Sequence, residues 1–141
     1  MENDYVTLEE AEARLAQVRP LLENARRIKR EIECIAAGYG YDTVLINEDK
    51  ERIAPLVTKF AETLDDLEAS GCYVKDLDIG LIDFLSSFEG RDIFLCWKLG
   101  EAHICHWHEI DEGFASRQEI LDMDQIFLEI DFETPMVENE N

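Results

Sequence analysis

The stretch that decides the fold is Asp92–Glu109, DIFLCWKLGEAHICHWHE. Apolar and aromatic residues fill both halves of this stretch, and Gly100-Glu101 lies between them. Side chains alternate between the two faces of a β-strand, and glycine readily adopts the backbone conformation of a tight turn. The stretch therefore predicts an antiparallel hairpin with strands over 92–98 and 102–109.

A two-residue turn at the glycine would place Cys96 opposite Cys105 and Leu95 opposite His106. In that register, His106 and His108 share one face with Leu95, and the two cysteines share the other. Both faces would be apolar, so the hairpin is expected at the centre of a sheet that is covered on both sides. Helices can cover one face. The candidate covers for the other face are a second chain and the segments 110–121 and 125–132.

The first half of the chain predicts two helices. Thr7 and Glu10 form the pattern of an N-terminal capping box. Two apolar seams with coiled-coil spacing follow it. The first contains Leu8, Ala11, Leu15, Val18, Leu22 and Ala25, and the second contains Ile53, Val57, Phe60, Leu64 and Leu67. Pro55 places the start of the second helix nearby. We therefore expect residues 1–70 to form an antiparallel, coiled-coil-like helical hairpin.

After Gly71 the pattern changes to short alternating segments. The expected elements are strands over 72–75 and 80–84, a loop over 86–90, the 92–109 hairpin, a loop or short helix over 110–121 and an edge strand over 125–132. The predicted fold class is α+β, with a helical hairpin followed by a small antiparallel β-sheet over 71–121. Residues 122–141 form an acidic tail that carries the edge strand.

The chain is strongly acidic, with 33 acidic against 13 basic residues and a formal net charge of −20. Such a field repels phosphate, so we expect no binding to nucleic acid or to a membrane surface, and a basic protein is the partner that the charge favours. No apolar run approaches the ~20 residues of a membrane span, and the acidic N-terminus has no signal region. A cytoplasmic location is therefore expected, with reduced cysteines.

His106-Trp107-His108 is an H-x-H pattern, which places two imidazoles on one face of a strand. His106 and His108 could hold a metal such as zinc, with Asp83 or Glu109 as the third ligand, although Glu109 points to the opposite face. The alternative is that one histidine is a core residue bonded to backbone. The expectation is no cofactor, with zinc as the less favoured alternative.

The facing cysteines of the predicted hairpin allow a second kind of site. Cys96 and Cys105 could form a redox-sensitive pair or, together with His103, bind a soft metal. The favoured interpretation is that both cysteines are small buried hydrophobic residues.

Polar side chains near the sheet could also form a pocket. The candidate catalytic residues are Asp83, His108 and Arg117, because a carboxylate, an imidazole and a guanidinium together can transfer protons or hold an anion. The candidate ligand-binding residues are Arg91, Glu101 and Trp107. The favoured alternative is a structural network in which Arg117 pairs with Asp83 or Glu101 and fixes the loop, because no spacing in the sequence demands catalysis.

Several short motifs occur in a specific order along the chain: Thr7–Ala11, Val18–Leu22, Val74–Asp76, Gly80–Phe84, Gly90-Arg91, Leu95–Glu101, Trp107–Glu109 and Gly113–Gln118. With these motifs the chain resembles the bacterial family known as domain of unknown function 2203, over roughly residues 5–121. The resemblance implies no established activity. Its motif positions include Cys96, Trp97, Trp107, His108 and Arg117, whereas His103 and His106 lie outside the pattern.

Three functions remain open from the sequence. The first is a homo-oligomeric interaction or scaffold protein, because the helical arms have long apolar seams and few residues to bury them. The second is a small-ligand binder or enzyme with a pocket around Asp83, Arg91, His108 and Arg117. The third is a metal-binding protein that uses His106 and His108. A non-enzymatic role is favoured.

Overall fold

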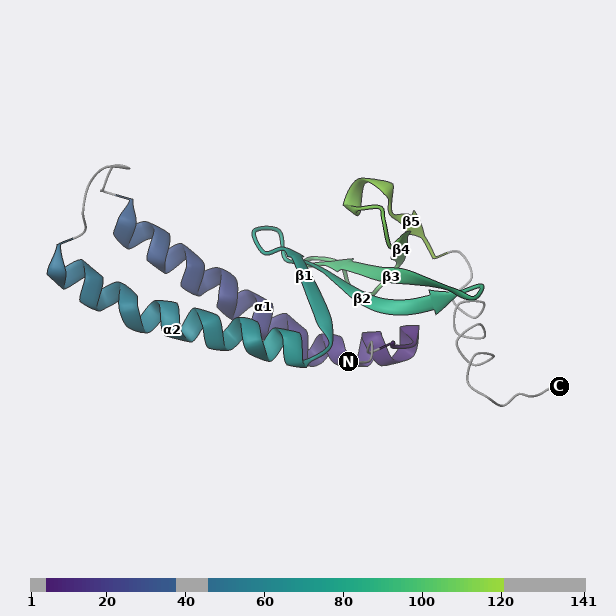
Figure 1. The fold of residues 1–141 in the computed structure, drawn as a ribbon, viewed down its shortest axis with the longest axis horizontal. Coiled ribbons are helices and arrows are strands. Elements are labelled where there is room, and N and C mark those ends of the chain that lie inside the picture. Colours follow the sequence, from purple (N-terminus) through teal and green to yellow (C-terminus); the bar gives the residue numbers. More distant parts are fainter. Residues whose placement is uncertain (1–4, 38–45, 121–141) are drawn as a thin grey trace.

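The computed structural model describes residues 5–37 and 46–120. Helices α1 (Leu8–Ala36) and α2 (Asn47–Ala69) form an antiparallel hairpin, and an antiparallel sheet packs against one end of it (Figure 1). The five strands lie side by side in chain order: β1 (Cys72–Asp76), β2 (Leu81–Phe88), β3 (Arg91–Lys98), β4 (His106–Glu109) and β5 (Gln118–Glu119). The α+β class is confirmed, whereas the predicted strand over 125–132 lies outside the described residues.

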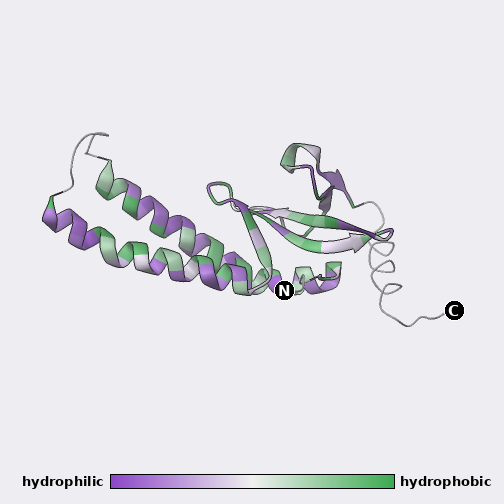
Figure 2. Cartoon of the chain, viewed as in Figure 1, coloured by the Kyte–Doolittle hydropathy of each residue, from purple (hydrophilic) through white to green (hydrophobic). Residues whose placement is uncertain are grey.

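Helix α1 begins as its sequence predicts. The Thr7 hydroxyl accepts a hydrogen bond from the Glu10 amide, and the Glu10 carboxylate accepts one from the Thr7 amide, so the capping box is complete. The apolar seam of α1 is buried along its length: Leu8, Ala11, Leu15, Val18, Leu22, Ala25 and Ile28. Figure 2 shows the resulting division of the helix into a hydrophobic and a hydrophilic side. The seam therefore fixes which side of α1 faces the rest of the molecule.

Helix α2 begins at Asn47, so the prediction that its regular part starts near Pro55 is wrong. Pro55 lies inside the helix, where it removes one backbone donor without ending the helix. Glu48 and Asp49 occupy the first turn, where negative charge stabilises the positive end of the helix dipole. Within the described residues, neither helix combines the length and the hydropathy of a membrane span.

The sheet has a side that faces the helices and an outer side. On the helix-facing side, Ile82, Phe84, Leu95 and Trp97 join the buried seam of α1 and α2 in one hydrophobic core. Burial of each such side chain contributes about 1.5–3 kcal/mol. The residues that alternate with them, such as Asp83, point to the outer side. The helices thus cover one face of the sheet, as expected.

The tightest hairpin of the sheet joins β2 to β3. Phe88 pairs with Arg91, so Glu89 and Gly90 form a two-residue turn. Both have positive φ, 54° and 79°, as a type I′ turn requires. The predicted loop over 86–90 is therefore wrong, because residues 86–88 belong to strand β2.

The connection between β3 and β4 is longer than the sequence predicts. Strand β4 begins at His106 rather than at Ala102, so the predicted two-residue turn at Gly100-Glu101 is wrong. Two hydrogen bonds hold the loop after Lys98. The Glu101 amide donates to the Lys98 carbonyl, and the Trp97 indole donates to the Glu101 carbonyl.

Helix α1 anchors the rest of this loop. The Glu12 carboxylate accepts a hydrogen bond from the Ile104 amide, and the Arg19 guanidinium donates to the Ala102 carbonyl. These contacts with a helix far away in sequence extend the loop and delay the start of the strand. A local turn pattern cannot predict them.

The extended loop shifts the register by one residue. Leu95 stands opposite Trp107 and Cys96 stands opposite His106, so the predicted pairs Leu95–His106 and Cys96–Cys105 are wrong. Because side chains alternate, the shift changes which groups share a face. His106 and His108 lie on the outer side with Cys96, whereas Trp107 lies on the helix-facing side with Leu95.

Substitutions of glycine separate backbone strain from packing at the turns. Gly80 has a φ of +69°, and a Cβ there would lie 2.5 Å from the Leu99 side chain. Gly90 also has a positive φ, but a Cβ would meet nothing within 4 Å. We expect Gly90→Ala to lower the free energy of unfolding by about 1–2 kcal/mol, and Gly80→Ala by roughly 2–4 kcal/mol, because overpacking adds to the strain.

Urea denaturation followed by tryptophan fluorescence measures both effects. Gly113→Ala is the control, since Gly113 has no positive φ and a Cβ there also meets nothing within 4 Å. Equal losses for the Gly80 and Gly90 variants would contradict the close packing of Leu99 on Gly80.

Candidate functional site

A deeply buried polar contact of the sheet joins Asp83 on β2 to His108 on β4. The exposed fractions are 1% for Asp83 and 2% for His108. His108 Nε2 lies 3.0 Å from Asp83 Oδ2, and His108 Nδ1 lies 2.8 Å from the Glu109 carbonyl oxygen. The ring of Phe94, which stands opposite His108, lies against the imidazole with the ring centres 5.5 Å apart. The pair is therefore held by packing as well as by hydrogen bonds.

The chemistry of these contacts fixes where the protons lie. A carbonyl oxygen only accepts, so His108 Nδ1 carries a hydrogen and donates it to Glu109. A single further proton then lies between Nε2 and the Asp83 carboxylate, and the pair as a whole is neutral. Burial raises the pKa of Asp83, and the nearby His108 opposes that rise. The pair is thus a neutral, proton-sharing unit inside the sheet.

Cys96 lies beside this pair. It stands directly opposite Asp83 in the sheet, and its Sγ, a carboxylate oxygen of Asp83 and a ring nitrogen of His108 lie within 4.8 Å of one another. Burial, followed by the negative charge of Asp83, raises the pKa of the Cys96 thiol to about 12. The thiol is therefore protonated at neutral pH, as expected for a buried hydrophobic cysteine. The predicted burial of both Cys96 and Cys105 is wrong for Cys105, which is exposed in the loop before β4.

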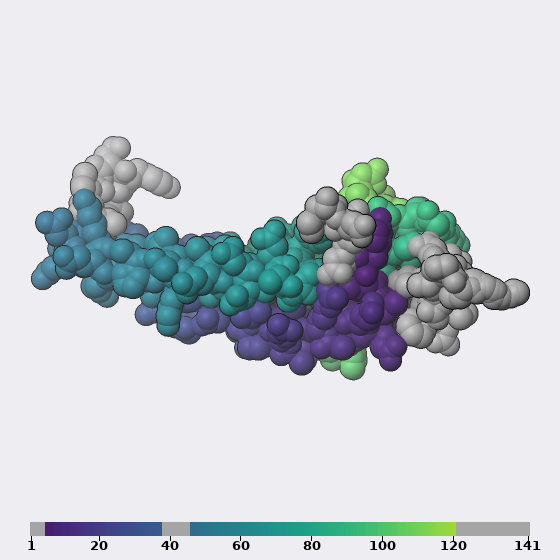
Figure 3. Space-filling view, turned by 60° about the horizontal axis from the view of Figure 1, so that its bottom comes forward, coloured from purple at the N-terminus to yellow at the C-terminus, as the bar shows by residue number. Residues whose placement is uncertain are grey.

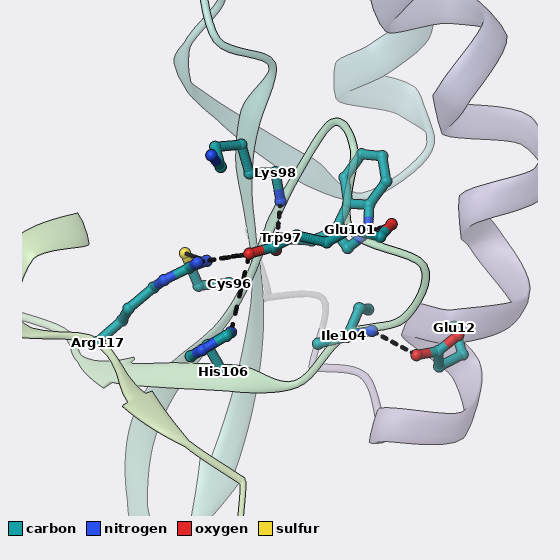
Figure 4. Close-up of polar contacts among 8 residues, drawn as sticks. All are labelled: Glu12, Cys96, Trp97, Lys98, Glu101, Ile104, His106 and Arg117. Atoms are coloured by element: carbon teal, nitrogen blue, oxygen red, sulfur yellow. Dashed lines mark hydrogen bonds and ion pairs between the residues drawn. The ribbon is translucent and has the colours of Figure 1, made fainter.

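A second polar group surrounds Glu101 at the edge of the outer side (Figure 4). Arg117 donates two hydrogen bonds to the Glu101 carboxylate, and the Lys98 amide donates one at 3.0 Å. Burial by itself would raise the pKa of Glu101, but the hydrogen bonds from Arg117 and Lys98 hold that pKa below its ordinary value. The predicted structural network in which Arg117 pairs with Glu101 is present, and it closes the loop after β3.

The three histidines lie in different surroundings. His106 and His108 share the outer side, as an H-x-H pattern on a strand predicts. The Nδ1 atom of His106 is buried without a hydrogen-bond partner among the described residues, and the nearest carboxylate oxygen of Glu101 lies 4.0 Å away. His103 lies in the loop, with Nδ1 3.3 Å from Glu12. His108 makes the contact with Asp83, and the metal pair His106–His108 stays a prediction.

Two predicted ligand-binding residues belong to the other side of the sheet. Arg91 pairs with Glu109 at 2.7 Å, and its guanidinium lies over the rings of Phe88 and Trp107. Trp107 itself packs in the hydrophobic core. The structure thus brings together Asp83 and His108, places Arg117 next to Cys96, and separates Arg91 and Trp107 from them. The catalytic role of Asp83, His108 and Arg117 stays a prediction.

Sequence reasoning missed the role of Cys96. The predicted register placed this thiol on the face opposite His108, whereas the observed register places both on the outer side. It also missed Lys75, whose Nζ lies 3.8 Å from Asp83 Oδ2. The available signal was alternation along β1 and β2, which places Lys75 and Asp83 on the same side once Tyr73 is paired with Asp83.

The chain is thus a small α+β protein with a helical hairpin on one face of the sheet and a polar cluster on the other. The model of the family described as "Uncharacterized conserved protein (DUF2203)" matches residues 4–120, and the chain belongs to this family. The resemblance seen in the sequence motifs is therefore confirmed. Comparisons with curated proteins and with solved structures give no match.

The Glu101–Arg117 pair predicts a pH dependence of stability. A lowered pKa in the folded state means that the pair contributes fully above the ordinary value of 4.5, and that the contribution is lost as the pH falls through the folded pKa. We expect Glu101→Gln to lower the free energy of unfolding by about 1–2 kcal/mol at pH 7. The difference in the free energy of unfolding between Glu101→Gln and the wild type should vanish in acid.

Urea unfolding at a series of pH values measures this difference. Glu112→Gln is the matched control, because Glu112 is exposed and should change stability little at any pH. A Glu101→Gln effect that is constant from neutral pH into acid would show that the ionised pair is not its cause.

Proposed function

We propose that this chain is a cytosolic, homo-oligomeric interaction protein whose helical hairpin pairs with the hairpin of a second copy. The observation that carries the proposal is the position of the hairpin's exposed apolar residues. The hairpin extends well beyond the sheet as a two-helix arm (Figures 1 and 3). Two helices alone cannot bury an apolar seam as a bundle of four does.

Burial along the arm supports this proposal. The buried residues of α1 end at Ile28, and those of α2 are Thr63 and Leu67. Toward the tip, the apolar side chains are only partly buried: Ile32, Ile35, Ile53, Leu56 and Phe60. Val57 is 50% exposed and Ile46 is 54% exposed. An interface over this part of the arm would remove all of these side chains from water.

The charge of the arm favours a second copy of this chain as the partner that covers its apolar residues. Two chains of net charge −20 repel each other over most of their surface. The outer part of the arm, residues 28–36 and 46–57, carries five acidic and four basic residues and is nearly neutral. Self-association through this region therefore meets the least repulsion, and the mixed signs allow ion pairs between copies.

The state of the cysteines agrees with a reducing compartment. All four cysteines of the chain are free, and two of them, Cys34 and Cys105, are exposed. Exposed free thiols persist where cellular reductants keep them reduced. This supports the cytosolic part of the proposal.

Sedimentation equilibrium at micromolar concentration tests the assembly. We expect the mass of a dimer for the wild type and weaker association for Val57→Glu. Loss of about 1 kcal/mol of apolar burial per copy would raise the dissociation constant roughly tenfold or more.

The matched control is Ile110→Glu, which changes a similarly exposed residue, at 44%, in the segment after β4. It should leave the association constant unchanged. A wild-type protein that remains monomeric at tens of micromolar, or a Val57→Glu variant that associates as tightly as the wild type, would refute the proposed interface. Association that requires an added basic protein would assign the arm to a different partner and would also refute it.

A further inference from the structure

Three side chains with metal-binding chemistry meet on the outer side of the sheet. Asp83, Cys96 and His108 each offer one ligand atom, these atoms lie within 4.8 Å of one another, and all three residues are buried. They come from three neighbouring strands of the sheet. Strands in the centre of a sheet are rigid, so the donors are held close together before any ion binds.

We propose that Asp83, Cys96 and His108 form a binding site for one divalent transition-metal ion of the zinc class. A carboxylate oxygen, a thiolate sulfur and an imidazole nitrogen are the ligand types that Zn²⁺ binds in proteins. Ca²⁺ and Mg²⁺ prefer oxygen ligands alone, so the thiol and the imidazole select against them. The site shares His108 with the sequence-based pair of His106 and His108 and takes its other ligands from Asp83 and Cys96.

Two features of the buried atoms point to an ion. Asp83 Oδ1 is buried and has no hydrogen-bond partner among the described residues, although Asp83 is only 1% exposed. Such an atom is costly to bury unless something binds it. His108 donates its Nδ1 hydrogen to the Glu109 carbonyl and directs Nε2 at the cluster. Histidine ligands of metals commonly donate their other ring N–H in this way.

The charges balance when an ion binds. The Cys96 thiol loses its proton, and the proton shared by Asp83 and His108 also leaves, so two protons are released as one dication enters. The carboxylate and the thiolate then neutralise the ion, while His108 remains neutral. A neutral cluster is the form that a buried site tolerates best.

Two cations stand at the edges of the cluster. Lys75 Nζ lies 3.8 Å from Asp83 Oδ2, and its side chain is 42% exposed, so it can turn into solvent when the ion binds. Arg117 lies 3.9 Å from Cys96 Sγ, but its charge is already paired with Glu101. Neither cation therefore prevents a metal ion from binding, because Lys75 can move away and the charge of Arg117 is already paired.

Cobalt absorption tests the site, because Co²⁺ bound to a thiolate gives a charge-transfer band. The starting protein is the full chain with Cys34→Ser and Cys105→Ser, which removes the two exposed thiols. We expect one equivalent of Co²⁺ to give the band, excess Zn²⁺ to abolish it, and Asp83→Asn to weaken Co²⁺ binding at least tenfold.

The decisive comparison is between the two buried cysteines. Cys96→Ser should abolish the band, whereas Cys72→Ser, the matched control on the helix-facing side, should retain it. If Cys96→Ser does not fold, X-ray absorption of the zinc-loaded starting protein decides instead, with one sulfur at about 2.3 Å and nitrogen or oxygen ligands expected. No cobalt band in the starting protein, a band that persists without Cys96, or a zinc shell without sulfur would overturn the proposal.

Discussion

The pairing of β3 with β4 is the constraint on which the rest of the structure depends. With Leu95 opposite Trp107 and Cys96 opposite His106, Leu95, Trp97 and Trp107 point to the helices, and Cys96, His106 and His108 point to the outer side. A slip of one residue would exchange the two sets, because the side-chain period of a strand is two. It would turn His108 toward the hydrophobic core and Trp107 toward the polar cluster on the outer side. The hydrophobic core therefore selects this register.

Helix α1 and the loop after β3 stabilise each other through polar contacts at the edge of that core. Glu12 and Arg19 hold the loop from the helix, and Glu101 holds it from within, through Lys98 and Arg117. Each of these contacts joins a charged group to a backbone group or to an opposite charge, which is the stronger kind of hydrogen bond. The loop thereby fixes where β4 starts, and so where His108 meets Asp83.

Much of the fold follows from local patterns in the sequence. The capping box at Thr7, the apolar seam of α1 and the strand nature of residues 92–98 all depend on near neighbours along the chain, and all are present. The start of β4 and the turn at Glu89-Gly90 were missed. The first depends on contacts between the loop and α1, and the second required a non-glycine residue at positive φ, which is uncommon. Asp83 and His108 could be named as site candidates, but Cys96 could join them only after the register was known.

The two ends of the molecule therefore carry separate chemistry. The arm presents apolar residues in nearly neutral surroundings, and the outer side of the sheet holds a neutral cluster of Asp83, Cys96 and His108. The cluster depends directly on the arrangement of the β3–β4 pair. The most direct test is the pattern of nuclear Overhauser effects between the two strands in solution. The observed register predicts contacts across the pairs Leu95–Trp107 and Phe94–His108. Contacts that instead pair Leu95 with His106 and Phe94 with Trp107 would contradict it.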